Sequence, residues 1–205
     1  MEQLGPEEIE QRSFQIIEEL LGGKELPKGH EHIIKRCIHT SADFDYADNL
    51  FFSPGVVHII SEAIKGGCLI IADTEMVKAG INKERLKRYG AEVRCFISDE
   101  DVAGDAKKRG TTRAAVAVEK AAKLSCPMVF AVGNAPTALI KLYELIGSGF
   151  TPAGIIAVPV GFVNVVESKE LIMRAVVPCI VAKGRKGGSN IAAAICNAII
   201  YDILY

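Results

Sequence analysis

The stretch MVFAVGNAPTAL, residues 128–139, runs from a continuous apolar segment through a turn into the start of a helix. The segment Met128–Val132 contains no polar side chain, which is typical of a strand in a parallel sheet that helices cover on both faces. Gly133 suits a tight turn, Asn134 is a candidate N-cap, and Pro136 falls in the first helical turn, where proline is tolerated. The stretch therefore predicts a buried strand that leads through a short loop into a helix.

The same order of apolar run and helical pattern recurs on both sides of this stretch. The other predicted strands are Cys68–Asp73, Glu92–Ile97, Ile155–Val158 and Cys179–Ala182. Helices are predicted at Pro54–Lys65, Lys83–Tyr89, Thr111–Leu124, Ala135–Ile146, Val165–Arg174 and Ser189–Leu204. Because alternating strands and helices imply right-handed crossovers, we expect an α/β fold. It should be a single doubly wound domain over residues 1–205, with a mainly parallel sheet and helices on both faces.

Composition and charge limit the classes of partner. The chain has 205 residues, a formal net charge of −1, 49% hydrophobic residues and no tryptophan. A near-neutral charge argues against a nucleic-acid partner, and no apolar run approaches the roughly 20 residues of a membrane-spanning helix. The N-terminal segment is acidic and polar, unlike a signal peptide, and six dispersed cysteines fit a reducing compartment. We therefore expect a soluble cytoplasmic protein.

Ligands of doubly wound sheets bind beyond the carboxyl ends of the strands. In this chain the segments that follow the predicted strands are polar and rich in glycine. Because parallel strands end at the same edge of the sheet, these polar and glycine residues should lie along that edge. These segments are Asp73–Glu75, Ser98–Asp99, Gly133–Thr137, Pro159–Phe162 and Lys183–Ser189. We expect the functional site at this edge.

An amphipathic helix is predicted at Pro6–Leu21, and we expect its apolar stripe to be buried. The members of the stripe are Ile9, Ile16, Ile17, Leu20 and Leu21. Ser13 falls on the same stripe, so its hydroxyl group needs a partner. That partner is either the backbone four residues earlier or a ligand.

A second helix, His30–Thr40, places Arg36 and His39 side by side on its polar face, because they are three residues apart. His39 lies at the end of this helix and is followed by the hydroxyl residues Thr40 and Ser41. That arrangement suits an imidazole at the mouth of a cleft, where histidine exchanges protons near neutral pH. The cation of Arg36 would favour the neutral imidazole, which can accept a proton.

Three aspartates, Asp43, Asp45 and Asp48, follow this helix and superficially suggest a metal-binding loop. The loop lacks the glycine and the bidentate glutamate of an EF-hand. We therefore expect turn chemistry here and no metal site in the protein.

Two basic, glycine-containing segments each begin a helix. RGTTR, residues 109–113, places Arg113 beside helix-start amides that attract anions, and its forked donor suits a carboxylate. GRKGGS, residues 184–189, lets the backbone approach a ligand closely at Gly187 and Gly188, with Ser189 as a candidate N-cap. It matches neither nucleotide phosphate-binding pattern. Together the segments predict a large pocket with several anion donors.

Several short segments of the sequence are specific enough to indicate a protein family as well as a fold. They are RSF from Arg12, RCIHTSAD from Arg36, RGTTR from Arg109, GNAPTAL from Gly133, VPVGFV from Val158, ESK from Glu167 and GRKGGS from Gly184. In this order, and over nearly the whole chain, they resemble the precorrin-8X methylmutase (precorrin isomerase) family. The segment HTSADFDYAD, which starts at His39, looks more like the cobalt-early, anaerobic branch than the aerobic one.

The resemblance implies an isomerase of cobalamin biosynthesis that moves a methyl group from C-11 to C-12 of a corrin-precursor tetrapyrrole. The product would be hydrogenobyrinate from precorrin-8X, or cobyrinate from cobalt-precorrin-8. The resemblance also implies a homodimer with its active site near the subunit interface, and no nucleotide cofactor. The family's acid/base histidine falls on His39, and its substrate-contacting residues fall on Ser13, Arg36 and Arg113. The other expected substrate-binding residues are Thr40, Gly187, Gly188 and Ser189.

Two other functions compete with this one. The first is a non-catalytic corrinoid carrier, which would bind the macrocycle and leave its methyl position unchanged. The second is an α/β isomerase or transferase that acts on a phosphorylated small molecule, since GRKGGS and RGTTR could hold phosphate.

Overall fold

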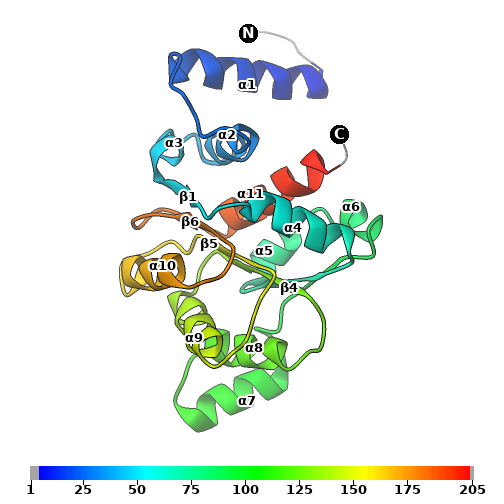
Figure 1. The fold of residues 1–205 in the computed structure, drawn as a ribbon, viewed down its shortest axis with the longest axis vertical. Helices are drawn as coiled ribbons and strands as arrows, with labels where there is room; N and C mark the ends of the chain where they lie inside the picture. The colour runs from blue at the N-terminus through cyan, green and yellow to red at the C-terminus, as the bar shows by residue number, and fades with distance from the viewer. Residues whose placement is uncertain (1–4, 204–205) are drawn as a thin grey trace.

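The computed structural model describes residues 5–203, which form a six-stranded sheet with helices on both faces (Figure 1). The strands are β1 Leu50–Phe52, β2 Leu69–Ala72, β3 Glu92–Arg94, β4 Met128–Val132, β5 Gly154–Ala157 and β6 Cys179–Ala182. They lie in the order β1-β6-β5-β4-β2-β3. All neighbours pair in parallel except β1, which is antiparallel to β6 with Leu50 opposite Ala182. The predicted α/β fold with a mainly parallel sheet is confirmed.

Helices form layers on both sides of this sheet. Their bounds are α1 Pro6–Leu21, α2 Glu31–Ser41, α3 Tyr46–Asn49, α4 Val56–Lys65, α5 Glu75–Gly80, α6 Lys83–Lys87, α7 Glu100–Arg109, α8 Arg113–Ala122, α9 Pro136–Gly147, α10 Val165–Arg174 and α11 Ser189–Asp202. One core cluster joins the sheet to α4, α5, α6 and α11, and α2 packs against α11. The other joins the opposite face to α8, α9 and α10. The polypeptide thus forms three layers, and α2 adds its buried residues Ile33, Ile34, Cys37 and Ile38 to the first cluster from beyond α11.

The alternation of side chains along β4 explains why its sequence is continuously apolar. Val129 and Ala131 face the cluster that contains α11, whereas Met128, Phe130 and Val132 face the cluster that contains α9. Successive side chains of a strand point to opposite faces. Because both faces are buried, neither set can be polar.

Several elements carry no clear signal in the sequence. The antiparallel edge strand β1 and the short helices α3 and α5 were not predicted, and neither was α7. The sequence of α7, EDVAGDAKKR, is mostly charged and buries only Val102 and Ala106, so it shows no apolar stripe. The predicted strand Glu92–Ile97 ends at Arg94, and Leu204, the predicted end of the last helix, lies outside the described residues.

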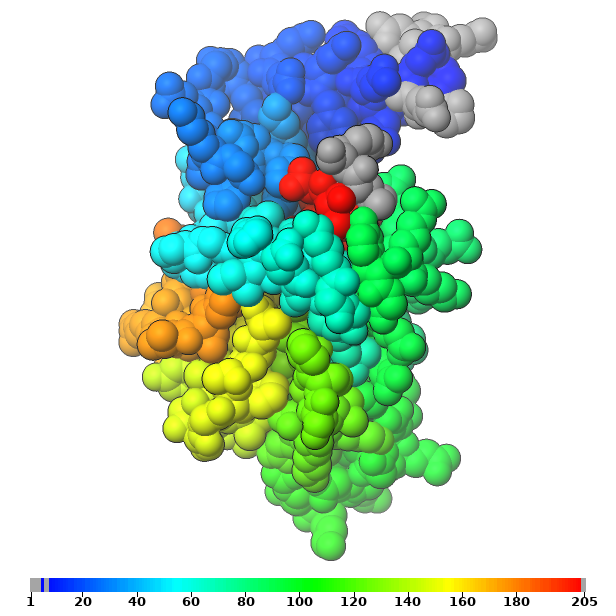
Figure 2. Space-filling view, turned by 45° about the vertical axis from the view of Figure 1, so that its right-hand side comes forward, coloured from blue at the N-terminus to red at the C-terminus, as the bar shows by residue number. Residues whose placement is uncertain are grey.

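The expected burial of the apolar stripe on α1 is wrong. Ile9, Ile16 and Leu20 are 53%, 40% and 66% exposed, and only Ile17 is fully buried. The reason is the position of α1, which lies at one end of the molecule and packs on α2, outside the layers that cover the sheet (Figures 1 and 2). The helix contacts the rest of the protein along a narrow line and leaves an apolar seam uncovered.

Burial also decides the state of the cysteines. Five of the six are buried free thiols, and Cys126 is exposed. Burial raises the pKa of Cys37 and of Cys196 to about 12, so these thiols stay protonated and pack as small apolar groups.

Within residues 5–203, no helix combines the length and apolar character that crossing a membrane requires.

Candidate active site

The buried carboxylate of Asp73, directly after β2, organises the predicted edge of the sheet. Its Oδ1 accepts a hydrogen bond from the Gly133 N–H at 2.9 Å, and its Oδ2 accepts from the Asn134 and Ala135 N–H groups at 2.7 and 2.8 Å. Burial raises the pKa of Asp73, while the three donors oppose that rise. The prediction of Asn134 as N-cap is wrong, because Ala135 holds that position and α9 has no side-chain cap. The Asp73 carboxylate already accepts hydrogen bonds from the backbone N–H groups that precede α9.

Ser189 is the first residue of α11, and Gly188 occupies the N-cap position. The prediction of Ser189 as N-cap is therefore wrong. Its Oγ lies 2.9 Å from Oγ1 of Thr74, a residue that caps α5 by accepting a hydrogen bond from the Val77 N–H. The hydroxyl pair joins the end of β2 to the start of α11.

The close backbone approach predicted for the GRKGGS loop is present, but its partner is the protein itself. A Cβ added at Gly187 would lie 2.1 Å from the Val158 carbonyl oxygen, and φ of Gly187 is +156°. The Gly188 N–H donates to the same oxygen at 2.8 Å. The two glycines therefore bring the loop against the end of β5.

Arg113 lies at the first position of α8, as the sequence indicates. Thr112 caps this helix by accepting a hydrogen bond from the Ala115 N–H at 3.2 Å, and its hydroxyl donates to Thr137 Oγ1 at 2.8 Å. The starts of α8 and α9 are therefore neighbours, and the side chain of Arg113 is exposed. Because α8 and α11 cover opposite faces of the sheet, no contact among the described residues joins Arg113 to His39.

His39 lies in the last turn of α2 and is exposed. Its ring stacks on Phe14 of α1, with centroids 5.2 Å apart and an interplanar angle of 22°. The Arg36 guanidinium lies 4.9 Å from the centroid of the same ring and ion-pairs with Glu10. The predicted adjacency of Arg36 and His39 is confirmed, with Phe14 contacting both. The Glu10 carboxylate offsets the positive charge of Arg36, which was expected to act on the His39 imidazole.

Ser13 and Thr40 lie on the same two helices as this cluster. The Ser13 hydroxyl donates to the Ile9 carbonyl at 2.8 Å, which is the first of its two predicted alternatives. Thr40 is exposed beside His39 at the end of α2. Within residues 5–203, the His39 ring has no hydrogen-bond partner, so both ring nitrogens are open to a ligand.

Lys186 of the GRKGGS loop connects this region to the end of α2. Its Nζ lies 2.7 Å from Oδ2 of Asp43 and 2.6 Å from Oδ2 of Asp45, and this lysine lowers the pKa of Asp43. Asp48 instead pairs with Lys24. The expected turn chemistry is present where Asp43 Oδ1 accepts a hydrogen bond from the Asp45 N–H at 3.0 Å, whereas the ion pairs of the three aspartates were not predicted.

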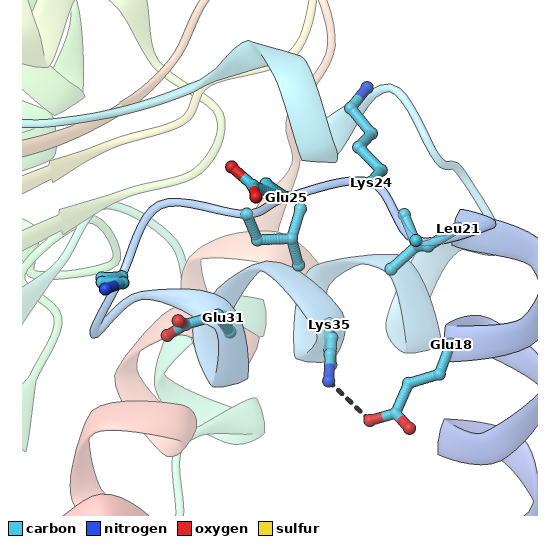
Figure 3. A pocket seen from close by; sticks show the side chains of 9 residues that line it. Glu18, Leu21, Lys24, Glu25, Glu31 and Lys35 are labelled. Carbon is cyan, nitrogen blue, oxygen red and sulfur yellow. Dashed lines mark hydrogen bonds and ion pairs between the residues drawn. The ribbon is translucent and has the colours of Figure 1, made fainter.

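A pocket of about 600 Å³ opens between the end of α1 and the start of α2, away from His39 (Figure 3). Three lysines and three glutamates line it, and Lys35 and Glu18 pair across it at 2.6 Å. Within the described residues, its lining includes none of the predicted site residues. Its balanced charges are a poor match for a ligand with many carboxylates.

The family model CbiC, described as Precorrin-8X methylmutase, matches residues 8–202. The chain belongs to the precorrin-8X methylmutase family. Precorrin-8X methylmutases are isomerases, and the match covers α1 from its third residue, all of α2 and all six strands.

Curated relatives and a solved structure agree with this membership. The chain is 44% identical to the cobalt-precorrin-8 methylmutase of Salmonella typhimurium, over 97% of this chain and 96% of that protein. It is 43% identical to the protein of the same name from Priestia megaterium, over 95% and 87%. It also resembles the precorrin-8X methyl mutase of Thermus thermophilus, with a TM-score of 0.87, 38% identity, and coverage of 96% and 97%.

Three residues in the region of the candidate site were not predicted as site residues from the sequence. Phe14, Thr74 and Lys169 lie within the segments RSF, Asp73–Glu75 and ESK, but no motif distinguishes them there. Lys169 is 1% exposed on α10, a helix whose other buried residues are Val165, Ser168 and Ile172. A lysine at helical spacing from buried apolar residues was the available signal.

Proposed function

We propose that this protein converts cobalt-precorrin-8 to cobyrinate by moving a methyl group from C-11 to C-12, in the cytoplasm. Its family membership supports the reaction, which belongs to cobalamin biosynthesis. Curated relatives named for the cobalt-containing substrate are 37–44% identical to this chain, against 34–37% for those named precorrin-8X methylmutase. Buried free thiols fit a reducing compartment.

The observation that carries the proposed mechanism is the setting of His39. Its ring is held by stacking on Phe14, and neither of its nitrogens is used within the described residues. Protonation of the macrocycle redistributes its conjugated electrons and makes the methyl shift feasible. We infer that His39 gives that proton to the ring that bears the migrating methyl group and takes it back afterwards. Histidine suits both directions near neutral pH.

The other proposed residues bind the carboxylates of the substrate. Arg36 and Arg113 supply forked cationic donors, while Thr40 supplies a hydroxyl beside the imidazole. The Ser13 hydroxyl can donate to a carboxylate only if it releases the Ile9 carbonyl. Gly187, Gly188 and Ser189 belong to the loop that Lys186 connects to the end of α2.

A second copy of the chain is the proposed partner of α1. Ile9, Ile16 and Leu20 recur at helical spacing and form one seam, and Ser13 lies beside it. Such an exposed apolar seam is a typical subunit contact. A copy that covers it would also enclose the surface near His39, which is exposed in the single chain. We therefore propose a homodimer whose active site lies near the interface.

The His39→Ala variant tests the mechanism. It should lower kcat with cobalt-precorrin-8 by about 10²–10⁴-fold, because the positioned acid/base is lost. Affinity for the product cobyrinate should change by less than about threefold, because binding relies mainly on other groups. His58→Ala, an exposed histidine on α4, is the matched control and should behave as wild type.

Two outcomes of this experiment contradict the proposal. Turnover of His39→Ala at the wild-type rate would remove the acid/base role. Return of bound substrate by the wild-type protein with its methyl group still at C-11 would make the chain a carrier.

A further inference from the structure

Lys169 on α10 is a fully buried cation whose partners are carbonyl oxygens. Its Nζ donates to the Gly184 and Lys186 carbonyls, each at 2.8 Å. Within residues 5–203 it forms no ion pair with a carboxylate, although a buried charge normally needs one. Burial lowers the pKa of Lys169 to about 8. The protein therefore buries the ammonium group of Lys169 beside the GRKGGS loop at a cost in free energy, and no carboxylate among the described residues pairs with it.

Three successive carbonyls of this loop bond to the protein. Lys169 holds those of Gly184 and Lys186, and the Gly161 N–H donates to that of Arg185 at 3.2 Å. In a trans peptide the N–H points opposite to the carbonyl of the preceding residue. The chain has no cis peptide among its described residues.

The outward direction of the loop amides follows from this geometry. The N–H groups of Arg185 and Gly187 point away from Lys169, and that of Lys186 points away from Gly161. Among the described residues, none of these three amides has an acceptor. Successive outward amides form a concave site that binds anions.

We propose that Lys169 is a positioning residue, which turns the amides of Arg185 and Gly187 outward so that they bind one carboxylate of the substrate. This inference rests on the proposed function, which supplies a substrate with several carboxylates. The ammonium group also provides a positive charge behind the loop. A bound carboxylate would supply the counter-anion that Lys169 lacks among the described residues.

Steady-state kinetics of the full-length protein with cobalt-precorrin-8 separates positioning from general structural support. In Lys169→Met the carbonyls lose their donor, and we expect KM to rise by about 10- to 100-fold. The kcat value should change by less than about threefold, because the proton transfer at His39 does not use this loop. Lys169→Arg, which keeps the charge and the donors, should restore KM to within about fivefold of wild type. Lys123→Met, at an exposed lysine after α8, controls for the loss of one charge.

The amide NMR spectrum of the wild-type protein, titrated with metal-free hydrogenobyrinate, tests the same inference if Lys169→Met does not fold. The amide protons of Arg185 and Gly187 should shift downfield on binding. That of Gly188, which already donates to Val158, should shift less and serves as an internal control.

The inference is overturned if KM of folded Lys169→Met matches wild type, or if kcat falls while KM stays constant. It is also overturned if the Arg185 and Gly187 amides do not move when the ring is bound. A protein that binds the ring but does not rearrange it would fail the proposed function alone, since the amide shifts would still report whether Arg185 and Gly187 bind a carboxylate.

Discussion

At the scale of single residues, the Asp73 carboxylate shows how the edge of the sheet is held without a conventional helix cap. Three backbone donors of the loop before α9 converge on its two oxygens. Sequence patterns place Asp73 at this edge because it follows an apolar strand. They do not show that it binds amides from the neighbouring strand, since that contact joins positions about 60 residues apart.

Asp73→Asn should lower the free energy of unfolding by about 2–4 kcal/mol. The side-chain NH₂ group of asparagine would face the Gly133 N–H, so that two hydrogen-bond donors would meet without an acceptor. The negative charge that strengthens the hydrogen bonds from Asn134 and Ala135 would also be lost. Urea unfolding at fixed protein concentration measures the change. Asp105→Asn, at an exposed ion pair on α7, should cost less than about 0.5 kcal/mol. Equal losses in the two variants would refute the special role of Asp73.

At the scale of elements, α7 is held to its neighbours largely by charge. Its buried residues are Val102 and Ala106, which pack on Val116 and Ala117 of α8. Arg109 at the end of α7 pairs with Glu119 of α8 through both carboxylate oxygens, and Lys141 of α9 lies 3.3 Å from the same carboxylate. Hydrogen bonds from Arg109 lower the pKa of Glu119 to about 2.

The contribution of Glu119 to stability should therefore depend on pH. A carboxylate whose pKa is lowered in the folded state stabilises the fold above its ordinary pKa and loses that effect as pH falls toward the lowered value. Glu119→Gln should cost about 1–2 kcal/mol at pH 7, after allowing for solvent screening. The difference from wild type should shrink between about pH 5 and pH 2, as measured by denaturant unfolding at each pH. A difference that does not vary with pH would contradict this explanation.

Elements with an apolar pattern were predicted well, and those without one were not. The bounds of β4, β6 and α10 match the sequence prediction, because each element buries a continuous or periodic apolar set. The strand β1 is three residues long on the edge of the sheet, and α7 is mostly charged. Tertiary contacts determine such elements, and a local pattern does not record those contacts.

At the scale of the whole molecule, α1 is the helix whose apolar face the rest of the single chain leaves exposed. It rests on α2 at one end of the molecule (Figure 2). Its exposed residues Ile9, Ile16 and Leu20 form an apolar seam. The sequence predicted the helix with its observed bounds, together with burial of its apolar stripe, which the single chain does not provide. A helical period shows which side chains share a face, and it does not show which surface covers them.

Ile16→Lys should convert the proposed homodimer to monomer, because a charge would be buried in the centre of the seam. The variant should keep the far-UV spectrum of wild type and lose at least about tenfold in turnover. Sedimentation velocity measures the assembly state, and Gln15→Lys, at an exposed position on another side of α1, is the control. A wild-type protein that sediments as a monomer at micromolar concentration would contradict the dimer.

The candidate site was predicted in its parts more than in its arrangement. The sequence identified His39, Arg36 and the GRKGGS loop from residue type and spacing. It did not show that Phe14 contacts His39 and Arg36, or that Lys186 joins the loop to Asp43. These contacts link segments that are far apart in the chain, so no spacing rule reports them.

The position of the methyl group in the product tests the central claim most directly. The full-length protein would be incubated with cobalt-precorrin-8 that carries ¹³C in its C-11 methyl group. The corrinoid would then be converted to its diamagnetic dicyano-cobalt(III) form for ¹³C NMR. We predict that the labelled methyl resonance moves to the position of a C-12 methyl group in cobyrinate. A label that remains on C-11 after prolonged incubation, in ligand that the protein demonstrably binds, would contradict the account.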